Sequence, residues 1–133
     1  YKRQIADRAA RDAGWEPPSI EEQVDRQFSG EKAALRPIFD RVRELLEELG
    51  KDVTMEGRST YIPFVRRRQF AAVAAATQTR VDVGLRYVDP PPSALLEPAA
   101  APGQATHKVR LSSPDEVTAE VEELLRAAYQ QNG

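Results

Sequence analysis

The spacing of the apolar residues changes twice along this chain, and this change constrains the fold more than any other feature. Between Leu35 and Leu49, large apolar residues recur every three or four positions, which is the spacing of one buried helix face. In several segments after Val53 they alternate with polar residues, as in half-buried strands. After Ser113 the helical spacing returns. Because the apolar faces of helices must be covered, the pattern predicts a two-layer α+β domain.

The predicted sheet is mainly antiparallel and has four to five strands. Short turns separate the strand segments, and short turns join antiparallel neighbours. The N-terminal helices and the C-terminal helix are expected to pack on one face of the sheet. The predicted strands are Val53–Glu56, Thr60–Arg66, Gln69–Thr77, Thr79–Tyr87 and Thr106–Leu111.

Start and stop signals mark the predicted helices. Ser19 can cap a helix that carries Ile20, Val24 and Phe28 on one side. Gly50 is a typical stop for the central helix. At the C-terminal end, Ser113 and Glu116 have the spacing of a capping box, which predicts that the last helix begins there.

The chain is long enough for one domain with a single core, since it has 133 residues. We expect that domain at 19–133, after a helical arm and proline linker at 1–18. Residues 89–105 hold five of the ten prolines and show no strand pattern. A proline-rich loop is therefore predicted at 89–105.

Composition excludes several classes of function. The chain has no cysteine, which excludes disulfides, thiolate metal sites and cysteine nucleophiles, and suits a reducing cytoplasm. No apolar run is long enough to span a bilayer, so no membrane association is expected. The glycines form no phosphate-binding loop, and we expect neither a cofactor nor a bound metal.

Charge is distributed unevenly, although the net charge is only −2. Between Val53 and Ser112 there are eight basic residues and four acidic ones, which gives +4 and leaves −6 for the rest. A basic centre between acidic flanks bears on the choice of partner rather than on the fold.

The basic centre contains the candidate binding residues. Four of them alternate with core residues and should point away from the core, and two lie at the adjoining turn, so their side chains could converge on an anion. Tyr61 and Phe64 are expected to add stacking surfaces. The candidates are Tyr61, Arg66, Arg68, Arg80, Arg86, His107, Lys108 and Arg110. The simpler interpretation is a solvated sheet face on which the arginines pair with Asp82 and Glu56.

Several groups of residues resemble one bacterial family in order and spacing. They are Gly30–Asp40, Thr60-Tyr61, Arg67–Ala71, Thr79–Leu85, Thr106–Ser113 and Ala127–Tyr129. The family is domain of unknown function family 5655, and the resemblance spans about Val24 to Tyr129. Its members often follow another short domain of unknown function. They usually have two lysines where this chain has Arg58 and Ser59. The resemblance implies a shape and assigns no catalytic residues.

These observations favour a non-catalytic binding or interaction domain that engages an anionic ligand, either nucleic acid or a nucleotide, or a protein partner. The partner could also be a fused domain or a second copy of the chain. One alternative is a small hydrolase-like enzyme that uses His107, the only histidine. Another is an iron carrier that uses acidic helix faces, because the predicted architecture is similar to small proteins proposed as frataxin-like iron carriers.

Overall fold

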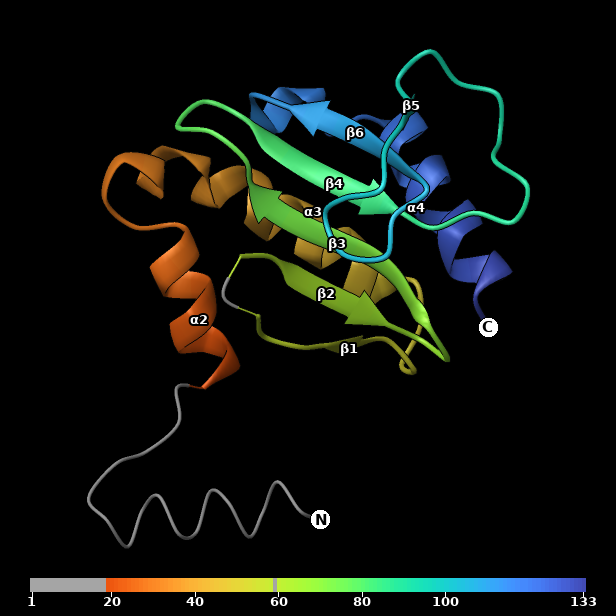
Figure 1. Cartoon of the computed structure of the whole chain (residues 1–133), viewed down its shortest axis with the longest axis horizontal. Helices are drawn as coiled ribbons and strands as arrows, with labels where there is room; N and C mark the ends of the chain where they lie inside the picture. Colours follow the sequence, from red (N-terminus) through yellow and green to blue (C-terminus); the bar gives the residue numbers. More distant parts are fainter. Residues whose placement is uncertain (1–18, 59) are drawn as a thin grey trace, which may run out of the picture.

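The computed structural model describes residues 19–58 and 60–133 (Figure 1). The arm and linker predicted at 1–18 lie outside the described residues. The described elements, in chain order, are α2 (Ile20–Gln27), η1 (Gly30–Leu35), α3 (Arg36–Glu48), β1 (Thr54–Met55), β2 (Ile62–Val65), β3 (Gln69–Ala75), β4 (Val81–Leu85), β5 (Glu97–Pro98), β6 (His107–Leu111), η2 (Pro114–Glu116) and α4 (Ala119–Gln131), where η denotes a 3₁₀ helix.

The described strands form one six-stranded sheet in the order β1-β2-β3-β4-β6-β5. Every neighbouring pair is antiparallel. Figure 1 shows α3 and α4 on one face of this sheet. The predicted two-layer α+β class is therefore confirmed, with more strands than expected.

The additional strand, β5, lies inside the segment predicted to be a loop. Glu97 pairs with Lys108, and Pro98 pairs with His107. The prediction of no strand at 89–105 was wrong at these two positions. Proline lacks a backbone donor, but it can occupy an edge strand because one side of such a strand needs no ladder bonds.

The core lies between the sheet and the helices. The side chains of Phe39, Phe64 and Phe70 are fully buried there. Phe64 is therefore not available to stack on a ligand, contrary to the sequence-based expectation. Tyr87 donates from its hydroxyl to the Leu124 carbonyl oxygen at 2.6 Å, and its burial raises the pKa of the phenol.

The last helix begins later than its capping signal predicts. Ser113 does accept a hydrogen bond from the Asp115 backbone, but it caps the single 3₁₀ turn η2. α4 begins at Ala119, where the side chain of Thr118 accepts from the Val121 backbone. The sequence thus contains two successive caps, and the second one starts the helix.

A short segment crosses the face of the sheet that the helices leave uncovered, the outer face (Figure 1). We call this segment, Ala99–Thr106, the arch. Its base is closed by a bond from the Ala99 amide to the Thr106 carbonyl oxygen at 3.0 Å. A methyl group built at Gly84 would lie 2.5 Å from the Pro102 carbonyl oxygen. The arch therefore rests directly on β4, and it divides the outer face, which was expected to be open.

Candidate ligand-binding groove

The outer face carries a buried carboxylate between two cations. Asp82, the second residue of β4, is only 6% exposed. Its Oδ1 lies 2.9 Å from Arg80 Nε, and its Oδ2 lies 3.2 Å from Lys108 Nζ. Because one carboxylate faces two cations, the cluster keeps an excess positive charge. These pairs match the simpler sequence interpretation, which assigned Asp82 as a partner of the basic residues.

A hollow of about 370 Å³ adjoins this cluster. Tyr61, Asp82 and Lys108 line it together with part of the arch. Ala74 also lines the hollow, and register places it beside Asp82. Its methyl side chain leaves space above the sheet that a larger residue would fill. The sequence predicted Tyr61, Arg80 and Lys108 as site residues, and the fold brings these three into one neighbourhood.

A second hollow, of about 450 Å³, lies between α2, η1 and the end of β3. Its lining includes Arg26, Ser29 and Lys32, as well as the short side chains of 74–76. Thr60 and Ala74 line both hollows. The two hollows therefore adjoin each other on the outer face, and we refer to the two together as the groove.

The groove exists because β3 is longer than its neighbour. The pairing of β2 with β3 reaches Ile62 and Val73, and β3 continues to Ala75. Lys32 fills part of the uncovered edge by donating from Nζ to the Ala75 carbonyl oxygen at 2.9 Å. A lysine ammonium has three donors, so two remain for a ligand.

α2 is fixed beside the groove by packing and by ion pairs. Val24 is fully buried in the core. Arg43 of α3 contacts Glu21 at 2.6 Å, and Arg36 contacts Asp25 at 2.8 Å. The hydrogen bond from Arg43 lowers the pKa of Glu21. These contacts hold the helix that carries Arg26.

Sequence reasoning did not select Arg26 or Lys32. Arg26 is an exposed residue on a short amphipathic helix, and Lys32 lies in a 3₁₀ turn before the central helix. The only signal was indirect, since Lys32 belongs to a segment with family resemblance. Both residues lie near β3 because of contacts between residues far apart in the sequence. Lys32 and Ala75, for example, are 43 positions apart.

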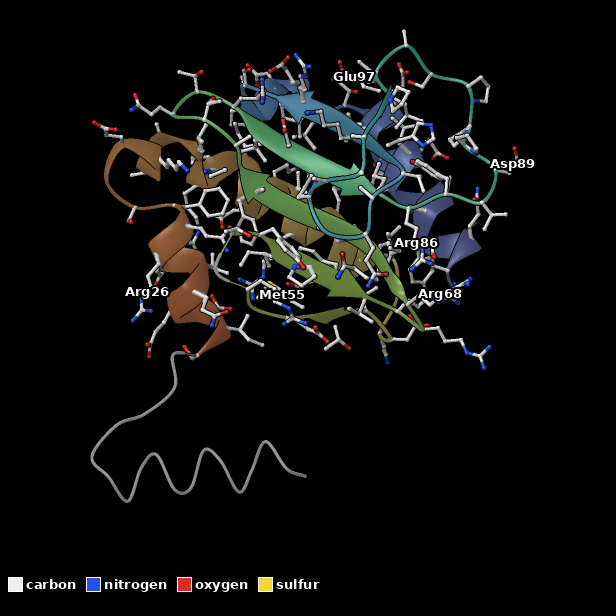
Figure 2. All side chains as sticks on the ribbon, viewed as in Figure 1. Arg26, Met55, Arg68, Arg86, Asp89 and Glu97 are labelled. Atoms are coloured by element: carbon white, nitrogen blue, oxygen red, sulfur yellow. The ribbon has the colours of Figure 1, made fainter. Side chains whose placement is uncertain are left out.

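The other predicted sheet arginines do not join this cluster. Arg86 lies beyond the arch and donates to Gln104 Oε1 at 2.6 Å. Arg110 contacts Glu97 of β5 at 2.7 Å. Figure 2 shows Arg26 near one end of the sheet and Arg86 near the other. The sequence had suggested that the basic side chains converge on a single anion. In the structure they lie too far apart along the sheet to do so.

Arg66 belongs to a separate network at the far end of the sheet. Its Nε lies 2.8 Å from Asp52 Oδ2, and its guanidinium carbon lies 3.9 Å from the centre of the Tyr129 ring. Tyr129 donates from its hydroxyl to Asp52 Oδ1 at 2.7 Å. The hydrogen bonds from Tyr129 and Arg66 lower the pKa of Asp52, and the bond to Asp52 raises the pKa of Tyr129. Neighbouring Arg68 donates to the Gln131 carbonyl oxygen at 3.2 Å.

His107 points away from the groove. It is half-buried on the helix-covered side, where its ring lies edge-on to that of Tyr87 at 5.8 Å. Its Nδ1 lies 3.0 Å from the Thr106 hydroxyl, which also accepts from the Tyr87 amide. The contacts described for His107 include no carboxylate that would orient the ring as a base.

Several acidic residues on the helices are paired with arginines. The pairs include Arg41–Glu44, Arg43–Glu47 and Arg126–Glu122. Within 19–58 and 60–133, no group of three or more His, Cys, Asp or Glu side chains is placed to hold a metal ion. In the same residues, no helix is both long and apolar enough to cross a membrane.

Comparison with known proteins gave one family. No curated protein and no solved structure matches the chain. A family model described as a domain of unknown function, DUF5655, matches residues 24–132. This range agrees with the resemblance seen in the sequence and includes every residue that we place in the groove. The chain therefore belongs to the DUF5655 family.

Proposed function

We propose that this protein is a non-catalytic bacterial binding domain that works in the cytoplasm and holds a small anionic ligand in the groove. The single observation that carries this proposal is the charge of the groove. Among the described residues, three cationic ones (Arg26, Lys32 and Lys108) and one carboxylate, that of Asp82, line the two adjoining hollows. Asp82 can neutralise only one of them, so an anion would be attracted.

The shape of the outer face favours a small ligand over a long one. A single-stranded nucleic acid that crossed the strands would meet the arch over Gly84. Two other basic residues of the outer face are already engaged, Arg86 by Gln104 and Arg110 by Glu97. A ligand that fits between α2 and the arch avoids both obstacles. Small anions that the groove can enclose are therefore the expected ligands, rather than long nucleic acids.

Calorimetric titration with ADP at low and high salt tests the proposal. We expect binding that weakens as salt rises, because ions screen exposed charges. Replacing Lys108 or Lys32 with alanine should weaken binding about tenfold, since each removes a charge-assisted hydrogen bond. Arg67→Ala is the matched control, because Arg67 is an exposed cation outside the groove.

Two results would overturn this function. One is that none of ADP, UDP and pyrophosphate binds to the unmodified protein in a salt-sensitive manner. The other is an equal loss of affinity in Arg67→Ala and in both lysine variants, which would indicate attraction to overall charge. Melting temperatures of all variants must stay close to that of the unmodified protein, so that any lost affinity reflects the groove.

A further inference from the structure

We propose that the groove is two-ended and recognises a nucleotide, with phosphate at the α2 end and the planar base at the arch end. This inference rests on the proposed function and specifies its ligand. It follows from the different side chains that line the two hollows. The lining of the α2 end includes the two cations Arg26 and Lys32, whereas the arch end has the aromatic ring of Tyr61 and the ring of Pro102 beside the Lys108–Asp82 pair.

The α2 end has the chemistry of a phosphate site. Arg26 and Lys32 supply two positive charges, and Ser29 supplies a hydroxyl. In the described residues neither cation is paired with a carboxylate. Guanidinium and ammonium groups are the usual protein partners of phosphate oxygens. Asp82 lines only the arch end, and the described residues that line the α2 end include no carboxylate.

The arch end has the chemistry of a site for a flat ring. Tyr61 is partly exposed and borders the hollow together with Pro102. Ala74, whose side chain is a single methyl group, also lines this hollow. A tyrosine ring can stack on any of the bases, because every base has an aromatic face. Lys108 also lines this hollow and can donate to a polar edge of the ring.

The two hollows are neighbours. Thr60 and Ala74 border both of them, so the phosphate and the base of one nucleotide would enter adjoining hollows. The arch limits the groove at the base end, because Pro102 and Gly103 lie over β4 and β3. A single nucleotide unit is thereby favoured over a polymer.

The test compares ligands that contain phosphate alone, a base and sugar without phosphate, or both. ADP, UDP, pyrophosphate and adenosine are titrated into the full chain by calorimetry. At least one of the two nucleotides should bind about tenfold more tightly than pyrophosphate, since stacking adds to the phosphate contacts. Tyr61→Ala should remove that advantage and leave pyrophosphate binding unchanged, whereas Tyr61→Phe should retain it. Arg26→Ala should weaken nucleotide and pyrophosphate to the same extent.

The outcomes separate this inference from the proposed function. If pyrophosphate binds as tightly as both nucleotides, or if Tyr61→Ala weakens all of these ligands equally, the base site is refuted while anion binding stands. If no nucleotide and no pyrophosphate binds in a salt-sensitive manner, both proposals fail. Tyr61→Phe guards against a folding artefact, because it keeps the ring and loses only the hydroxyl.

Discussion

The clusters around Asp82 and Asp52 both join a carboxylate to basic and aromatic neighbours, but they use their charges differently. Asp52 accepts from both Arg66 and Tyr129, and Arg66 also donates to the Tyr129 carbonyl oxygen. Asp82 instead pairs with two cations, Arg80 and Lys108, beside an open hollow. In the Asp52 cluster, the hydrogen-bond donors are used to hold α4 against the sheet. In the Asp82 cluster, hydrogen-bond donors remain that could contact a ligand.

The comparison shows why a count of arginines identifies a binding site poorly. Arg66 and Lys108 were equivalent candidates in the sequence, since both are basic and both belong to the strand region. Their partners differ because Arg66 reaches a helix, whereas Lys108 reaches into an open hollow. The useful criterion is the number of donors that remain after the contacts within the fold are satisfied.

The largest expected loss of stability is that of Gly84→Ala. This substitution changes the contact between the arch and β4 and leaves the Asp52 cluster intact. The new methyl group would meet the Pro102 carbonyl oxygen at 2.5 Å and the Ala105 side chain at 2.9 Å. Relief of this overlap requires the arch to move, at a cost of about 1–3 kcal/mol. Urea unfolding should show that loss, and limited proteolysis should cut the arch more readily. Unchanged values in both measurements would contradict the close contact.

Asp82→Asn should have a smaller effect on stability and the opposite effect on binding. Loss of the carboxylate leaves Arg80 and Lys108 without their shared counterion, but both are partly exposed, so we expect a cost of about 1 kcal/mol. The groove gains one positive charge, which should strengthen ADP binding several-fold. Asp89→Asn, an exposed site, is the control. Weaker binding in Asp82→Asn would show that the carboxylate itself contacts the ligand.

The smallest effect concerns acid stability at the Asp52 cluster. The pKa of Asp52 lies below its ordinary value of 3.8 in the folded chain, so its ionised form favours folding. This contribution is complete above about pH 4 and is lost as the pH falls through the lowered pKa. The melting temperature of Asp52→Asn should therefore lie below that of the unmodified protein at pH 7 and approach it at pH 2.5.

Glu48→Gln provides the matched control for this pH series. Glu48 is exposed, and no ion pair is described for it within 19–58 and 60–133. A melting-temperature difference for Asp52→Asn that stays constant with pH would contradict a role for its ionisation.

Strong periodicity made much of the fold predictable. The apolar residues from Ile38 to Leu46 lie on one side of α3, and Val81, Val83 and Leu85 lie on one side of β4. Such regular patterns leave few alternatives, because a shift of one residue in a strand would expose its core face. The start of α4 was less predictable, because Ser113 and Thr118 are both good caps.

The groove was less predictable, because small residues and long-range contacts create it. Ala74 and Gly84 give no functional signal in the sequence, yet one lines the groove and the other admits the arch. Tyr61 and Lys108 were found through their residue type and alternation. Arg26 was missed, because its position next to β3 depends on how α2 packs.

The ends of the sheet bear on how two copies of the chain could associate. The outermost strands β1 and β5 contain two residues each, and β5 includes Pro98, which has no amide hydrogen to offer. A neighbouring chain would find too short a row of backbone groups at either edge to continue the sheet. The edges of the described part of the chain therefore disfavour a dimer built by extending the sheet, and side-chain surfaces are the expected contacts between two copies.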